Sequence, residues 1–132
     1  RSPAYCAWTQ KNIALNGLGV ERNTVIREDC MRWLARCRAR FDLIFADPPT
    51  FSNRKGSPDV FDVQRDHVAL IEAAVHLLAP DGLLIFSTNY RRFRLDLHKL
   101  GRLHVQDITA TTIPFDFKRS PRVHQCWEMR KK

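Results

Sequence analysis

An apolar run that ends in an acid and two prolines constrains this chain more than any other feature. The stretch FDLIFADPP occupies residues 41–49. Each proline removes a backbone N–H donor, fixes its own φ and holds the residue before it in extended geometry. Asp47 and Pro48 therefore belong to a stiff corner that presents a carboxylate and carbonyl groups without N–H donors beside them. We expect a group that donates hydrogen bonds to bind there.

Helical and strand patterns alternate along the chain, which predicts an α/β fold with a mostly parallel sheet closed by an antiparallel hairpin. Ser2-Pro3 and Asn16-Gly17 predict the two ends of the first helix. Further helices are expected at 30–40, 62–79 and 93–100, strands at 23–29, 41–46, 83–89, 104–112 and 123–130, and loops at 51–58 and 113–121. The strand at 41–46 is nearly all apolar, as a buried central strand is.

Positive charge is concentrated in the last third of this single-domain-sized chain of 132 residues. Residues 89–132 hold eleven Lys and Arg against four Asp and Glu, whereas residues 1–88 are nearly balanced. The asymmetry indicates a polyanionic partner, nucleic acid before membrane, but a solvated basic face explains it equally well. The apolar runs are too short to cross a membrane, so we expect no membrane partner.

The cysteines give no sign of a metal site. Cys6, Cys30, Cys37 and Cys126 form no CxxC pair and have no histidines at ligand spacing. We expect no bound metal, reduced thiols and a cytoplasmic location.

Polar side chains lie at the carboxyl ends of three expected strands: Asp29, Asp47 and the run Ser87-Thr88-Asn89. Ligands of open α/β sheets bind beyond the carboxyl ends of the strands, so these side chains predict a binding edge. A lone Asp at such a place is usually a turn former or a helix cap. Asp29 has that alternative, because a helix is expected to begin at Cys30.

Four motifs resemble a known enzyme family. DPPTF after an apolar strand is similar to motif IV of S-adenosylmethionine-dependent methyltransferases, and LLAPDGLLIFSTN resembles the segment that leads into their fifth strand. DPPTFSN, FDVQRDHVAL, RRFRLDL and HQCW together resemble the N7-guanine half of bifunctional bacterial large-subunit rRNA guanine methyltransferases. The resemblance covers nearly the whole chain. It implies a Rossmann-like class I sheet, S-adenosylmethionine as cofactor and rRNA as partner.

The resemblance also implies roles for individual residues. Asp29 would meet the adenine amino group and Cys30 the same ring, while Asp47 and Pro48 would line the place where the methyl group meets the target base. Phe51 is a candidate for stacking on that base, with a core or loop anchor as the equal alternative. RNA contacts are expected of Asn89, Arg91, Arg92, Arg94, Lys118, Arg119 and Arg122.

Two parts of the family pattern have no counterpart in this sequence, the glycine-rich motif I and the acid that holds the ribose. Since the chain opens at Arg1 within a helix-start pattern, we expect a fragment that lacks the first strands and is inactive by itself. The missing N-terminal portion would then complete the cofactor pocket. Without it, we expect self-association, or direct pairing of the strands at 23–29 and 41–46.

The chemistry implied for guanine N7 needs no general base, because N7 carries a lone pair at neutral pH. That leaves Asp47 to accept hydrogen bonds from the guanine. Two other functions stay open. A cytosine-C5 methyltransferase would need a cysteine nucleophile, and Cys126 is far along the chain from the DPPTF loop. A non-catalytic RNA-binding module would keep the fold and use no cofactor.

Overall fold

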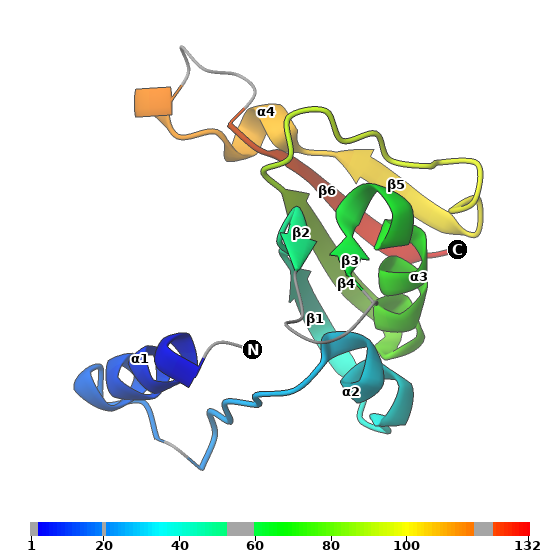
Figure 1. Ribbon diagram of the computed structural model, residues 1–132. Coiled ribbons are helices and arrows are strands. Elements are labelled where there is room, and N and C mark those ends of the chain that lie inside the picture. Colours follow the sequence, from blue (N-terminus) through cyan, green and yellow to red (C-terminus); the bar gives the residue numbers. More distant parts are fainter. Residues whose placement is uncertain (1–2, 20, 53–59, 118–122) are drawn as a thin grey trace. The chain divides into compact units, whose positions relative to one another are not determined.

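The computed structural model describes residues 3–19, 21–52, 60–117 and 123–132. They form two compact units, residues 1–37 and 38–132, whose elements Figure 1 labels. The first unit contains α1 (Pro3–Leu15) and α2 (Cys30–Arg36). The second contains β1 (Phe41–Ala46), β2 (Phe51–Ser52), β3 (Phe61–Asp62), α3 (Val63–His76), β4 (Leu78–Thr88), β5 (Leu103–Asp107), α4 (Thr109–Thr112), a 3₁₀ turn (Phe115–Phe117) and β6 (Gln125–Lys131).

Helix α1 ends as the sequence predicts. Gly17 has a φ of 64°, in the left-handed region that glycine enters without strain. Its N–H donates to Ala14 O at 3.1 Å, and the next N–H, of Leu18, donates to Ile13 O at 3.0 Å. This pair of bonds is the Schellman motif, which satisfies carbonyls that the helix leaves without partners. Ser2, the expected start, lies outside the described residues.

Residues 23–29 form no strand, so this prediction was wrong. A strand is stabilised by a neighbour that bonds to its backbone, and no described residue pairs with this segment in a sheet. The direct pairing of 23–29 with 41–46 stays a prediction, because the two segments belong to different units.

A four-stranded sheet in the order β1-β4-β6-β5 forms the centre of the second unit. β1 runs parallel to β4, and β6 is antiparallel to both β4 and β5. The α/β class and the terminal hairpin are confirmed. The described sheet is mixed and not mostly parallel, because the segment 23–29 adds no parallel strand to it. β2 and β3 pair separately as a short antiparallel ribbon.

Strand β4 begins earlier than predicted and takes in the segment 80–82, which was expected to lie before it. The segment is accommodated by a shift of register, since Phe41 lies opposite Leu78 whereas Leu43 lies opposite Leu83. A Cβ on the glycine of this segment would lie 2.9 Å from the carbonyl oxygen of Phe41. The irregularity therefore requires glycine at that position.

The core lies between α3 and one face of the sheet (Figure 1). Leu84 pairs with Met129 across β4 and β6, and Phe86 pairs with Trp127; all four side chains are buried. The buried residues of α3 that complete this core are Val63, His67, Leu70, Ile71, Ala74 and Val75. Adjacent rings of Phe86 and Trp127 have centroids 6.1 Å apart, within the range of favourable aromatic pairs.

The first turn of α3 is held by a small polar network. Asp62 caps the helix by accepting the N–H of Arg65 at 3.0 Å, and its own N–H donates to Asp66 Oδ2 at 2.9 Å. The guanidinium of Arg65 forms an ion pair with Asp66 and also donates to Val60 O. The hydrogen bond from Arg65 lowers the pKa of Asp66 below its ordinary value.

Where a helix was predicted at 93–100, residues 93–96 have no regular secondary structure and residues 97–100 form turns. Phe93 and Leu100 have helical spacing and are both buried. The backbone groups of Arg94 and Asp96, however, bond to side chains of α3 and not to one another. Contacts with a distant element thus replace the local helix.

The segment 104–112, expected as one strand, divides into β5 and α4. The Oδ1 atom of Asp107 accepts the N–H of Thr109 at 2.9 Å, which turns the chain out of the strand. Ile108 N–H still donates to Cys126 O, so the turn stays attached to β6.

Strand β1 lies at an edge of the sheet, although its apolar sequence predicted a buried central strand. Leu43 is 59% exposed and Phe45 is 64% exposed. Such a strand presents unpaired backbone groups and apolar side chains together, the combination that favours pairing with another strand.

We expect the polypeptide of residues 1–132 to self-associate through this edge. Leu43→Lys should reduce the association, because a charged side chain at an edge opposes strand addition. Sedimentation velocity over a range of concentrations measures the effect. A monomer at all concentrations in the unsubstituted polypeptide would contradict the expectation.

The lowered pKa of Asp66 leads to a second prediction, on how stability depends on pH. A depressed carboxyl pKa contributes stability above the unfolded-state value and loses it as the pH falls through the folded-state value. The free energy of unfolding of Asp66→Asn should therefore differ most from wild type near neutrality, and the difference should shrink below about pH 4. Urea unfolding of both proteins across this range tests it, and a difference independent of pH would refute it.

Candidate functional site

Asp47 directly follows β1 and is joined to β4. Because Ala46 lies opposite Phe86 in the parallel pair, the next residues of the two strands, Asp47 and Ser87, are neighbours. The hydroxyl of Ser87 donates to Asp47 Oδ1 at 2.8 Å. Ser87 is buried whereas Asp47 is exposed, so the fold fixes the direction of a carboxylate that solvent and ligands can reach.

A pocket of about 460 Å³ opens beside this pair. It lies on the face of β4 away from the core, since Ile85 and Ser87 alternate with the core residues of that strand. Its lining residues are Phe45, Asp47, Ile85, Ser87, Asn89, Ile108, Thr112, His124 and Cys126. Apolar walls with a few polar groups suit a flat, partly polar ligand such as a nucleobase.

Cys126 lines the same pocket, although its distance along the chain from Asp47 had counted against it. Antiparallel pairing of β4 with β6 places it opposite Ser87. Burial is the largest effect on its thiol and raises the pKa; the hydroxyl of Thr112 opposes this, and the carboxylate of Asp107 adds to it. A raised pKa disfavours the thiolate, which is the nucleophilic form of cysteine.

Thr112 and His124 form a polar pair at this pocket that the sequence reading missed. Thr112 Oγ1 and His124 Nε2 lie 2.8 Å apart. Strand alternation would have suggested His124, because residues two apart on a strand share a face and Cys126 follows it by two. No pattern in the sequence pointed to Thr112, because the segment that contains it was expected to be a strand and is the short helix α4 in the structure.

Phe51 is an exposed aromatic residue beside the candidate site. Its side chain is 55% exposed, which disfavours the alternative of a core anchor. The ring lies 6.4 Å from that of Tyr90, tilted by 57°. Asn89, which precedes Tyr90, lines the pocket, and Pro48 is half-buried next to Asp47.

Asp29 and Cys30 belong to the first unit, whereas Asp47 belongs to the second. Asp29 is the N-cap of α2, and its Oδ1 accepts the N–H of Arg32 at 3.1 Å. The helix-cap alternative for Asp29 is thus confirmed. Cys30 is the first residue of that helix, and contact of either residue with a cofactor stays a prediction.

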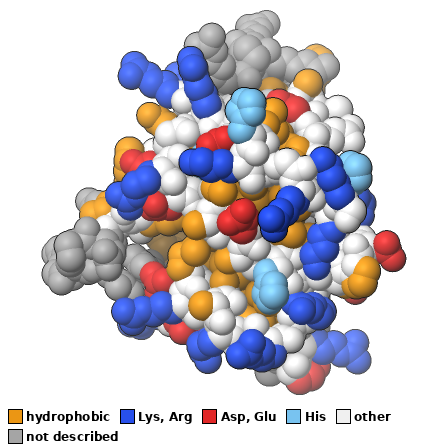
Figure 2. All heavy atoms as spheres, turned by 90° about the vertical axis from the view of Figure 1, so that its right-hand side faces the viewer, with side chains coloured by type: hydrophobic (Ala, Val, Ile, Leu, Met, Phe, Trp, Pro, Cys, Tyr) orange, Lys and Arg blue, Asp and Glu red, His pale blue; other side chains and the backbone are white. Residues whose placement is uncertain are grey.

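The described part of the last third contains two distinct groups of basic residues. Arg91, Arg92 and Arg94 are exposed, as expected for residues that bind an anion. Three cations at the C-terminus instead donate to backbone carbonyls of the same unit: Arg130 to Asp81, Lys131 to Leu78 and Lys132 to Gly101. Lys118, Arg119 and Arg122 lie outside the described residues. Figure 2 shows Lys and Arg side chains over much of one face, with Asp and Glu between them.

None of the helices in the described part of the chain combines the length and hydropathy that crossing a bilayer requires. Nor do three His, Cys, Asp or Glu side chains of the described residues gather closely enough to hold a metal ion.

Comparison with proteins of known sequence gives close relatives. The chain is 50% identical over 129 residues to a ribosomal RNA large subunit methyltransferase K/L of Cellvibrio japonicus, and 47% identical over 131 residues to that of Desulfotalea psychrophila. These matches cover 98% and 99% of the chain but 17% and 18% of the relatives. The chain thus spans less than a fifth of their length. No protein-family model matches it.

Solved structures show the same fold. SMU.776, solved in complex with SAH, matches 97% of the chain and 37% of its own length with a TM-score of 0.74 at 20% identity. A SAM-dependent methyltransferase from Agrobacterium tumefaciens matches 98% of the chain and 46% of its own length, with a TM-score of 0.65 at 17% identity. Over nearly all of its length, the chain is therefore similar to one segment of the ribosomal RNA large subunit methyltransferases K/L, and it shares the Rossmann-like fold of the solved SAM-dependent methyltransferases.

Proposed function

We propose that this chain is part of an S-adenosylmethionine-dependent enzyme that methylates guanine N7 in large-subunit ribosomal RNA. The names of the relatives support the reaction class and the RNA. The observation that carries the assignment to this site is the Asp47–Ser87 hydrogen bond at the wall of the pocket. It directs an accessible carboxylate to the edge where ligands of such sheets bind.

The residues of the chain position the base, and the cofactor supplies an electrophilic methyl group. Guanine N7 has its own lone pair, so no side chain needs to remove a proton. The carboxylate of Asp47 accepts one bond from Ser87 and retains capacity for the N1–H and amino group of guanine. Phe51 is exposed and offers a ring on which a base can stack. Correct placement of the reactants then provides most of the rate enhancement.

Asp29 and Cys30, together with Asp47 and Pro48, are the residues of the chain that would bind the cofactor. Asp29 uses Oδ1 to cap α2, and a carboxylate has further acceptor sites for the adenine amino group. The rest of the pocket would come from other parts of a longer polypeptide, since no glycine-rich loop of motif I occurs in this sequence. The exposed edge of β1 supports this, because an added strand would bury Leu43. Four free thiols agree with a cytoplasmic location.

The cytosine-C5 alternative has one observation in its favour, the place of Cys126 in the pocket. Its raised thiol pKa opposes a nucleophilic role. A non-catalytic RNA-binding module could use Asp47 to bind a base, but the complete polypeptide would then transfer no methyl group. The product of the reaction distinguishes all three.

Replacing Asp47 by Ala in the complete polypeptide should lower methyl transfer roughly 100-fold or more, as losses of a positioned polar group at a reaction centre do. Asp47→Asn should retain more activity, because its side-chain oxygen can still accept from Ser87. Transfer of tritiated methyl groups to unmodified large-subunit rRNA measures both variants. Ser87→Ala should have a smaller effect in the same direction.

Circular dichroism and thermal unfolding provide the control, since Asp47 is exposed and its loss should leave the fold intact. Full activity in Asp47→Ala would contradict the proposed role of this carboxylate.

The product provides the most specific test. N7-methylguanosine makes its ribose bond labile, so borohydride followed by aniline should break the modified rRNA at one guanosine. Unmethylated rRNA treated identically is the control. A methylated rRNA that resists cleavage would exclude N7 as the target. A methyl group recovered on cytosine would support the cytosine-C5 alternative, with Cys126 as its candidate nucleophile.

A further inference from the structure

The first half of the segment that joins β4 to β5 carries three arginines and is anchored by a buried aromatic ring. We call residues 90–96 the arginine strap. Phe93 within it is 4% exposed. Its ring centroid lies 4.9 Å from that of His67, 5.8 Å from Phe86 and 5.5 Å from Trp127. The strap is therefore packed into the core at its middle.

Gln64 of α3 binds the backbone of the strap on both sides of one residue. Its Nε2 donates to Arg94 O at 2.9 Å, and its Oε1 accepts the N–H of Arg94 at 2.9 Å. One side chain thus satisfies the donor and the acceptor of a single peptide position, as a neighbouring strand would.

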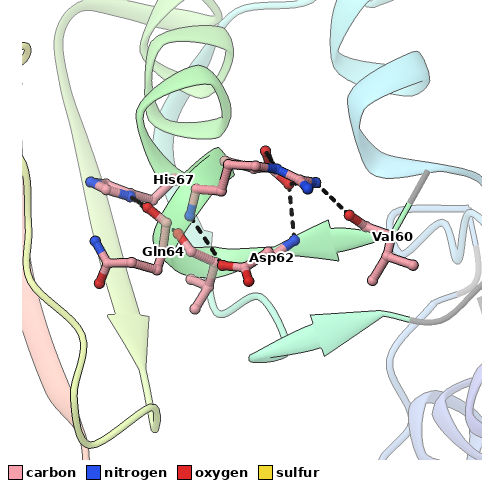
Figure 3. Close-up of polar contacts among 7 residues, drawn as sticks. Val60, Asp62, Gln64 and His67 are labelled. Carbon is pink, nitrogen blue, oxygen red and sulfur yellow. Dashed lines mark hydrogen bonds and ion pairs between the residues drawn. The ribbon is translucent and has the colours of Figure 1, made fainter. Parts of the chain in front are cut away.

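His67 holds the next part of the strap. Its Nδ1 lies 3.1 Å from Val63 O and 2.9 Å from Gln64 O, and carbonyl oxygens only accept, so Nδ1 carries the proton. Nε2 is then an acceptor, and it receives the N–H of Asp96 at 3.1 Å. Figure 3 shows Gln64 and His67 on α3, on the other side of its first turn from Val60. The two side chains face the strap from one helix.

Gln125, the first residue of β6, holds the beginning of the strap. Its Nε2 donates to Tyr90 O at 3.3 Å and to Phe93 O at 3.2 Å. Three side chains from two elements therefore hold the strap, and each hydrogen bond that they make to the strap is to its backbone.

The side chains of Arg91, Arg92 and Arg94 remain available. All three are exposed. Within the described part of the chain, none of their guanidinium groups takes part in a hydrogen bond or an ion pair. The contrast with the C-terminal cations, which bond to carbonyls of the sheet, indicates that the strap arginines serve a partner and not the fold.

We propose that the arginine strap is a preformed element that binds RNA phosphodiesters, and that Gln64, His67 and Gln125 are its positioning residues. The inference rests on the proposed function, which makes RNA the substrate. A loose strap would have to be ordered when RNA binds, and that ordering would weaken the affinity. A strap whose backbone is already bonded presents its three cations without that cost.

A double-mutant cycle on the complete polypeptide, with an unmodified large-subunit rRNA transcript as the probe, separates positioning from charge. Gln64→Ala should weaken RNA binding roughly tenfold, the equivalent of the lost pair of hydrogen bonds. Replacing Arg91, Arg92 and Arg94 together by Gln should weaken it further and reduce its dependence on salt concentration. With those arginines absent, Gln64→Ala should cause no additional loss, because Gln64 acts through them.

Two controls make the interpretation specific. Gln10, an exposed glutamine of α1, provides the matched variant Gln10→Ala, which should bind RNA as wild type does. For His67, Gln can accept the N–H of Asp96 whereas Phe cannot, so His67→Gln should bind RNA more tightly than His67→Phe. Hydrogen exchange at the amides of Arg94 and Asp96 reports directly on the hydrogen bonds that hold the strap, and it should accelerate in Gln64→Ala.

The outcomes separate this inference from the function on which it rests. No rRNA binding by the wild-type protein would overturn both. Binding that Gln64→Ala leaves unchanged would overturn the inference alone. An equal loss from Gln64→Ala with and without the three arginines would show that Gln64 acts through general stability, which also overturns it.

Discussion

The parallel pairing of β1 with β4 is the constraint on which the candidate site depends. Its register places Ala46 opposite Phe86, so residues 47 and 87, forty positions apart in the chain, become neighbours and share a hydrogen bond of 2.8 Å. The alternation of β4 then divides its side chains between two roles. Leu84 and Phe86 enter the core with α3, while Ile85 and Ser87 line the pocket. A shift of one residue in this register would exchange the two faces and separate the carboxylate from its hydroxyl donor.

Side-chain bonds to the backbone decide the conformation of the strap. The helix predicted at 93–100, with Phe93 and Leu100 at helical spacing, overlaps the strap. A helix would use its own N–H and C=O groups internally, and so would compete with Gln64 and His67 for the same atoms. The buried ring of Phe93, between His67 and the aromatic residues of the sheet, favours the non-helical path. The result is a segment ordered without regular secondary structure.

The sequence predicted most where local chemistry decides the structure. The Gly17 cap, the helix that begins at Cys30, the strand at 41–46 and the terminal hairpin all follow from nearby residues or simple periodicity. Prediction failed where a distant partner decides. The segment 23–29 has the composition of a strand but no neighbour in the described sheet, and the strap takes its conformation from α3. The site shows the same division: Asp47 was evident from its two prolines, whereas Cys126 and Thr112 reach the pocket only through the pairing of β6.

One carboxylate influences two competing chemistries in the pocket. Burial is the main cause that raises the pKa of Cys126, and the charge of Asp47 adds a smaller contribution in the same direction. In the proposed function, the negative charge that disfavours a thiolate is also the acceptor for the N1–H and amino donors of guanine. Cytosine presents a single amino donor and no ring N–H on its pairing edge, so it satisfies the carboxylate less well. Under the proposed function, the acceptor fixed by Ser87 would suit a purine with adjacent donors, whose own lone pair attacks the methyl group without activation by the protein.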